Sequence, residues 1–128
     1  ARIRLIGDGD VAAGLMAMME EHSGIDILMG IGGSPEGVLV GCAVRCLGGD
    51  MQARLWPRDE AERAVAVKEG HEVDRVLTMN DLCRGENVFL AATGVTDGEM
   101  LKGVRYGPRS ATTESLVMRS ISGTISSM

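Results

Sequence analysis

The chain has 128 residues, of which 45% are hydrophobic and 24% charged, enough for one ordinary domain or part of a larger one. Its net charge of −5 disfavours general binding to nucleic acid or anionic membranes, and 2% aromatic residues are too few for base-stacking platforms. No apolar stretch approaches the roughly 20 residues that a bilayer-spanning helix needs, and no signal peptide is visible.

Apolar strand-like runs alternate with helical patterns in the first part of the chain. We expect strands at 2–6, 25–31 and 51–56, and helices at 11–22, 37–47 and 60–69. Asp10 is suited to cap the first helix, and Pro35 fits the first turn of the second. This order predicts a mostly parallel sheet with helical crossovers. A strand pattern that begins at once also suggests a truncated or processed N-terminus.

Strand patterns dominate the rest of the chain. The apolar runs lie at 76–79, 87–92, 103–106 and 111–125, and Gly-Pro-Arg-Ser at 107–110 is typical of a hairpin turn. No repeat or linker interrupts the sequence, so residues 1–128 are interpreted as one α/β unit.

Cysteine and histidine give no sign of a soft-metal site. Cys42, Cys46 and Cys83 are odd in number and contain no Cys-x-x-Cys pair, so we expect small buried thiols in a reducing cytoplasm. His22 and His71 lie near helix ends beside acidic residues, where solvated surface positions are the expectation.

Three polar glycine loops follow predicted strands, at 7–10, 30–37 and 93–98. In open α/β sheets, ligands bind outside the carboxyl ends of the strands, so the agreement of the three loops favours a binding site there. The third loop, taken alone, is most simply a turn.

Asp8-Gly9-Asp10 places two carboxylates around a flexible residue. Such carboxylates accept hydrogen bonds from sugar hydroxyls or bind a hard cation. The alternative is structural, with Asp10 as a helix cap and Asp8 as a turn residue.

The loop from Gly30 to Gly37 combines close backbone approach, a helix N-terminus and a carboxylate. Free amides at a helix N-terminus suit a phosphate group, and Glu36 could bind a divalent metal. Helix capping without chemistry is the alternative. Pro35 occupies the third glycine position of a dinucleotide fingerprint, which counts against a nucleotide-binding domain.

Several segments resemble the class II (GlpX-type) fructose-1,6-bisphosphatases, in the order in which that family has them. They are Asp-Gly-Asp-Val-Ala at 8–12, Gly-Ile-Gly-Gly-Ser-Pro-Glu-Gly-Val at 30–38, Arg-Cys-Leu-Gly-Gly at 45–49, Ala-Ala-Thr-Gly-Val-Thr-Asp-Gly at 91–98, Gly-Val-Arg-Tyr at 103–106 and Ser-Leu-Val-Met-Arg-Ser at 115–120. The resemblance spans nearly the whole chain and corresponds to the C-terminal part of the family's polypeptide.

The resemblance implies an α/β sugar-phosphatase domain like that of inositol monophosphatase. It implies hydrolysis of the 1-phosphate of fructose 1,6-bisphosphate with Mn²⁺ or Mg²⁺, in gluconeogenesis or the Calvin cycle, and in cyanobacterial relatives also of sedoheptulose 1,7-bisphosphate. It further implies a cytoplasmic homodimer or homotetramer. By the same resemblance, Asp8, Gly9, Asp10 and Gly33 contact substrate and Glu36 is a metal ligand.

Two further motifs of the family have no counterpart in these 128 residues. They are the metal-binding Asp-Pro-(Ile/Leu)-(Glu/Asp)-Gly-Thr and the phosphate-binding Lys-Pro-Arg-His, both upstream of Asp-Gly-Asp in the family. Glu36 alone cannot hold a catalytic metal cluster, because hard cations need several oxygen ligands. We therefore expect this polypeptide alone to be inactive, with apolar surface exposed where its other half would pack. A non-catalytic sugar-phosphate-binding domain is the alternative.

Two local departures from the family pattern lie near the C-terminus. Glu114 replaces the histidine of Thr-Thr-His-Ser, and Ile121 replaces the lysine of Arg-Ser-Lys-Ser/Thr-Gly. Both are expected to alter the local surface more than the active site.

Overall fold

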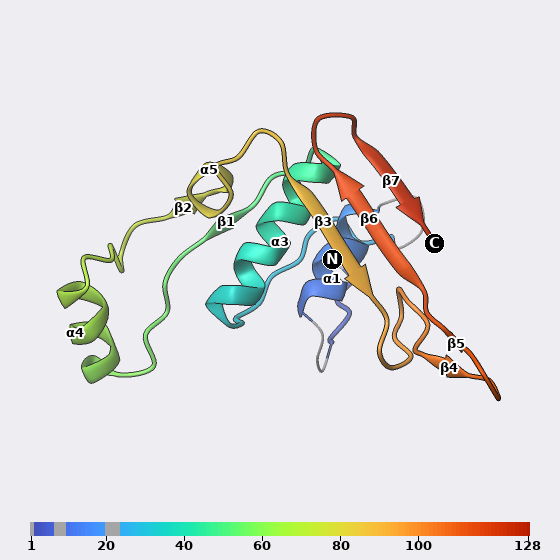
Figure 1. Cartoon of the computed structure of the whole chain (residues 1–128). Helices are drawn as coiled ribbons and strands as arrows, with labels where there is room; N and C mark the ends of the chain where they lie inside the picture. Colours follow the sequence, from blue (N-terminus) through green and yellow to red (C-terminus); the bar gives the residue numbers. More distant parts are fainter. Residues whose placement is uncertain (1, 7–9, 20–23) are drawn as a thin grey trace.

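The computed structural model describes residues 2–6, 10–19 and 24–128, and Figure 1 shows the whole chain. Its helices are α1 (Asp10–Met18), α3 (Ser34–Leu47), α4 (Glu60–Lys68) and α5 (Met79–Leu82). Its strands are β1 (Gln52–Ala53), β2 (Leu77–Thr78), β3 (Phe89–Thr93), β4 (Arg105–Tyr106), β5 (Ala111–Thr112), β6 (Ser115–Arg119) and β7 (Thr124–Ser127). The mixed α/β class is confirmed.

The prediction of a mostly parallel sheet is wrong for the described part of the chain. Its strands form three small sheets, β1-β2, β3-β6-β7 and β4-β5. Within each sheet, neighbouring strands are antiparallel. Residues 2–6 and 25–31 form no strand, and of 51–56 only β1 remains. A parallel crossover needs the strands before and after a helix to lie side by side in one sheet. Here residues 2–6 and 25–31 form no strand, and β1 pairs antiparallel with β2, so no such crossover forms.

The start and end of α4 and the end of α3 agree with the sequence, whereas α3 begins at Ser34 rather than 37 and the helix expected at 11–22 ends at Met18. Pro35 lies in the first turn of α3, and Gly48 ends it in the left-handed conformation with φ of 74°. Asp59 caps α4, its side chain accepting from the Glu62 amide at 2.8 Å. The predicted hairpin turn at 107–110 joins β4 to β5.

The core lies between α3 and one face of the three-stranded sheet. Alternate residues of β3 and β6 point toward the helices, so that Leu90, Leu116 and Met118 are buried with Ala43 and Cys46 of α3. α1 packs on α3 and adds Leu15 to this cluster. A thin layer of small and aliphatic side chains therefore holds the two helices on the sheet.

Residues 54–76 form an arm, at the left of Figure 1, that ends in α4. The β1–β2 pair closes its base, with Gln52 opposite Thr78. No residue of α4 is buried. Within the arm Val73 is buried, and the Asp59 cap and ion pairs such as Arg63–Asp74 at 2.6 Å add to its stability.

The molecule exposes far more surface than a folded monomer of its size. Its accessible surface is 9567 Å², whereas a compact monomer of this mass exposes about 6,500 Å². Large apolar side chains contribute, including Leu5 at 91%, Met29 at 84% and Ile31 at 75% exposure. The expected exposure of apolar surface is present. No helix in the described ranges is long and apolar enough to cross a bilayer.

Candidate active site

The N-terminus of α3 has the features of an anion-binding site. Gly33 is its N-cap, with φ −66° and ψ 149°, and its carbonyl accepts from the Gly37 amide at 3.0 Å. A glycine has no side chain with which to cap the remaining amides of the first turn, and Pro35 has no amide to offer. The amides of Ser34 and Glu36 are therefore available, with the positive end of the helix dipole, to an external anion.

Glu36 is exposed, and its carboxylate folds back against Gly33. A Cβ placed on Gly33 would overlap with Glu36 Oε2. The backbone conformation of Gly33 is open to any residue, so a side chain at this position would conflict with the Glu36 carboxylate alone, and that flexible side chain would have to move. The glycine thus leaves the space in which the carboxylate lies, over the first turn of α3.

α1 and α3 start at the same end of the molecule (Figure 1). Val40 lies against Gly14, and further along both helices Met18 and Val44 lie against Gly49. These two contacts fix a parallel alignment. The first turn of α1, which begins at Asp10, therefore lies at the same end as Glu36.

The predicted substrate contacts of the first loop remain predictions. Asp8 and Gly9 lie outside the described residues, and for Asp10 the structure describes the backbone as the first residue of α1. Of the five predicted site residues, the structure brings Gly33 and Glu36 into direct contact. His22 also lies outside the described residues, and His71 is exposed as expected.

The loop after β3 lies toward the same end. Cys46 Sγ, near the C-terminus of α3, donates to the Val88 carbonyl at 3.5 Å, so β3 starts there and runs back toward the first turn of α3. Arg4 pairs with Glu99 at 2.9 Å, which holds the segment before the first loop beside the segment after the third. Among the described residues, no hydrogen bond or ion pair joins Glu36 to the loop after β3.

Asp97 in the third loop has a structural role. Its carboxylate accepts from the Gly103 amide at 2.8 Å and from Arg105 Nη2 at 3.0 Å. The hydrogen bond from Gly103, and then Arg105, lowers the pKa of Asp97. Asp97 thus connects the loop at 93–98 to Gly103 and Arg105 through hydrogen bonds to its carboxylate. This structural role agrees with the interpretation of the loop as a turn.

The same loop, at 93–98, is shaped by Gly94, Gly103 and Glu114, the residue that replaces the family's histidine. A Cβ at Gly94 would overlap with the Lys102 carbonyl, and one at Gly103 would lie 2.8 Å from backbone atoms of Thr96. Glu114 accepts from the Lys102 amide at 3.2 Å through its carboxylate, and from the Gly94 amide at 2.9 Å through its carbonyl. Glu114 therefore stabilises this loop.

The described residues do not form a complete metal site. The described ranges contain no group of three or more His, Cys, Asp or Glu side chains that could hold a metal ion. Glu36 fits the role of one ligand, because it is an exposed carboxylate beside an anion-binding helix end. A hard cation takes six or more oxygen ligands, so most of them would have to come from elsewhere.

Sequence reasoning missed the residues that align the site rather than form it. Gly14 in the middle of α1 allows α3 to approach, and a glycine inside a helical pattern was the available signal. The Asp97–Arg105 and Arg4–Glu99 pairs join residues far apart in the sequence, and no local pattern indicates them.

The N-termini of α1 and α3 lie at one end of this mixed α/β protein, and α3 carries the Glu36 carboxylate beside available amides. Such an arrangement is suited to an anionic, metal-associated ligand. Comparison with known proteins agrees with that class. The family described as "Bacterial fructose-1,6-bisphosphatase, glpX-encoded" matches residues 1–128, so the chain belongs to this family.

Curated relatives carry the same family name. The chain is 41% identical to the class 2 fructose-1,6-bisphosphatase of Haemophilus influenzae, over 98% of this chain and 41% of the relative. It is 41% identical to the class 2 D-fructose 1,6-bisphosphatase/sedoheptulose 1,7-bisphosphatase of a Synechococcus strain, over 98% and 40%. It is 40% identical to fructose-1,6-bisphosphatase 1 class 2 of Escherichia coli, over 97% and 40%. The chain thus spans about two fifths of the length of these relatives.

Proposed function

We propose that this chain supplies part of the active site of a divalent-metal-dependent sugar-bisphosphate phosphatase. The reaction is hydrolysis of the 1-phosphate of fructose 1,6-bisphosphate. The similarity to a relative named for both substrates supports sedoheptulose 1,7-bisphosphate as a second one. The observation that carries the proposal is the parallel packing of α1 on α3, which gathers the first turns of both helices at one end.

In this proposal each residue has a distinct role. Asp8, Gly9 and Asp10 contact substrate, with the carboxylates accepting hydrogen bonds from sugar hydroxyls. The backbone at Gly33 and the free amides of the first turn of α3 face a phosphate group. Glu36 is one ligand of Mn²⁺ or Mg²⁺, and such a cation, when bound, supplies charge neutralisation at the phosphoryl oxygens and an activated water.

The remainder of the family's polypeptide supplies the other ligands. The surface of the chain exceeds that of a compact monomer by about 3,000 Å², and part of this excess is where that remainder packs. The 128-residue chain alone is therefore inactive. The assembled enzyme is a cytoplasmic homodimer or homotetramer of the inositol monophosphatase-like class.

The second candidate is a non-catalytic sugar-phosphate-binding domain. What favours it is that the described residues lack a group of three metal ligands. It would bind a phosphosugar at the first turn of α3 without releasing phosphate.

The test is phosphate release from fructose 1,6-bisphosphate with Mn²⁺ by a full-length polypeptide that carries this sequence. Glu36→Gln should lower kcat at least a hundredfold, because the variant loses a charged metal ligand. Glu62→Gln is the matched control: Glu62 holds the same third helical position in α4 and should leave activity unchanged.

An inactive full-length polypeptide that still binds the phosphosugar would support the binding domain. Equal activity of Glu36→Gln and wild type would remove Glu36 from the metal site. Turnover by the 128-residue chain alone would contradict the need for ligands from elsewhere.

A further inference from the structure

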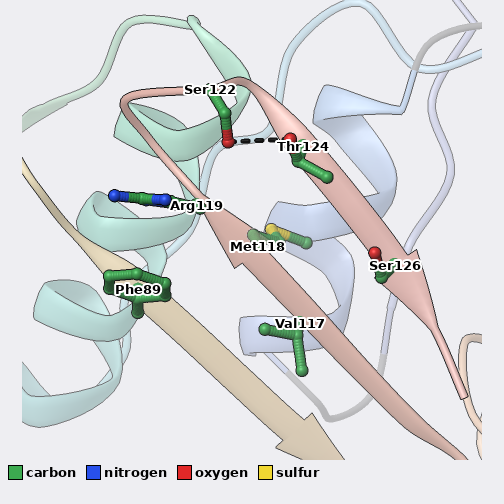
Figure 2. A pocket seen from close by; sticks show the side chains of 7 residues that line it. All are labelled: Phe89, Val117, Met118, Arg119, Ser122, Thr124 and Ser126. Atoms are coloured by element: carbon green, nitrogen blue, oxygen red, sulfur yellow. Dashed lines mark hydrogen bonds between the residues drawn. The ribbon is translucent and has the colours of Figure 1, made fainter.

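The outward face of the three-stranded sheet carries a hollow of about 250 Å³ (Figure 2). Phe89, Arg119 and Thr124 are directly opposite one another on β3, β6 and β7, so their side chains share this face. The hydroxyl groups of Ser122, Thr124 and Ser126 lie along one side of the hollow. The hollow is thus lined by one cation, one aromatic ring and three hydroxyls.

Arg119 differs from the arginines that form ion pairs. Arg4, Arg63 and Arg105 each pair with a carboxylate within 3.0 Å, whereas no ion pair is found for Arg119 in the described ranges. Its guanidinium instead lies over the ring of Phe89, 5.0 Å from the centroid. Stacking restricts the side chain and leaves the N–H groups at the guanidinium edge free to donate to a ligand.

The hydroxyls complete the donor set. Thr124 Oγ1 donates to Ser122 Oγ at 2.7 Å, which orients both groups at the turn between β6 and β7. Among the described residues that line the hollow there is no carboxylate, so nothing there repels an anion. Val117 forms an apolar part of the lining, and the charge at the site is therefore that of Arg119 alone.

We propose that this hollow binds a small phosphate monoester. The planar guanidinium of Arg119 matches two phosphate oxygens. The Ser122 and Ser126 hydroxyls donate to the third, because the proton of Thr124 Oγ1 is already donated to Ser122. The site is separate from the proposed active site: β6 ends beside the start of β3, near the C-terminus of α3, whereas Glu36 lies in the first turn of that helix. Figure 1 shows the β6–β7 turn at the opposite end from the first turn of α3.

The test is a titration of a ¹⁵N-labelled full-length polypeptide that carries this sequence with inorganic phosphate at constant ionic strength, followed by amide chemical shifts. Saturable shifts at residues 117–126 are expected, and chloride over the same range should produce none. Arg119→Gln should weaken phosphate binding about tenfold or more, since it removes a charge-assisted contact. Ser122→Ala should weaken it less and keeps the Arg119–Phe89 pair.

Arg54→Gln is the matched control, because Arg54 lies over Trp56 at 5.3 Å in the same kind of pair, away from the hydroxyls of the hollow. It should leave the affinity unchanged. The proposal is overturned if residues 117–126 do not shift, if chloride shifts them equally, or if Arg119→Gln and Ser122→Ala both bind phosphate like the wild type. An equal loss of affinity in Arg54→Gln would also overturn it, by showing a general effect of positive charge.

Discussion

Val40 of α3 lies directly on Gly14 of α1, so closely that a Cβ on Gly14 would come within 2.8 Å of Val40 Cγ1 and 3.1 Å of Cγ2. Both residues are buried, and the contact lies between the two helices whose first turns define the candidate site. The spacing of the helices, and with it the placement of Asp10 relative to Glu36, depends on the absence of a side chain at Gly14.

Gly14→Ala should therefore destabilise the chain. Overpacking costs about 1–3 kcal/mol, and the better helix propensity of alanine offsets up to about 1 kcal/mol of that. Gly37→Ala is the control, because Gly37 is also helical but a Cβ there meets no atom within 4 Å. Urea unfolding followed by helical circular dichroism should show a lower midpoint for Gly14→Ala and a higher one for Gly37→Ala. Equal midpoints would mean that the helices separate at no cost.

Gly33→Ala tests the positioning of Glu36. The new Cβ would displace the Glu36 carboxylate, while the backbone conformation at residue 33 tolerates alanine. In a full-length polypeptide that carries this sequence, we expect kcat/KM for fructose 1,6-bisphosphate to fall about tenfold or more, with little change in stability. Gly85→Ala, where a Cβ would make an ordinary contact with Val88 Cγ2 at 3.4 Å away from this loop, should leave kcat/KM unchanged. A Gly33→Ala enzyme with normal kcat/KM would show that the position of this carboxylate does not matter.

Asp97→Asn should change the pH dependence of stability. The pKa of Asp97 is lowered by the Gly103 amide and by Arg105, so its charged form stabilises the folded state above the ordinary pKa of about 4. That contribution is lost as the pH falls through the lowered folded pKa. The variant should therefore unfold at lower urea than wild type at pH 7, and the difference should shrink below about pH 4. A difference between Asp97→Asn and wild type that stays constant from about pH 7 to about pH 3 would exclude an ionic origin.

Cys42 should resist alkylation in the folded chain. Burial, and then the neighbouring Cys83 thiol, raise the pKa of Cys42 to about 11. The reactive thiolate is therefore about a hundredfold scarcer at pH 8 than for an ordinary thiol. Mass spectrometry after timed exposure to iodoacetamide should show slow modification of Cys42 in buffer and rapid modification in urea. Rapid labelling in buffer would mean that the α3–α5 contact opens readily.

What the sequence predicted well was encoded by neighbouring residues. Pro35 with Gly48, and Asp59 with Gly70, mark the ends of α3 and α4 because caps act within one turn. The contact between Gly33 and Glu36 follows from the same logic, since a cap and the third helical residue are adjacent in space.

What it predicted wrongly depends on distant partners. Residues 25–31 have the apolar content of a buried strand, yet Ile27 and Met29 are 74% and 84% exposed. An apolar run shows that a segment favours a sheet, but not which strand pairs with it or in which direction. The antiparallel pairing of β3 with β6, across more than twenty intervening residues, is set by the packing of Leu90, Leu116 and Met118 on α3.

The arm that ends in α4 should unfold locally, separately from the rest of the chain. Because no residue of α4 is buried and the β1–β2 pair closes the arm at its base, α4 can unfold and refold without disturbing the core cluster around Met118. Such a segment behaves as an independent cooperative unit, with amide protons that exchange at a low, local free energy of opening. Insertions and deletions within residues 54–76 should then be tolerated with little effect on the helix ends that carry Asp10 and Glu36, which leaves this part of the chain free to diverge in length.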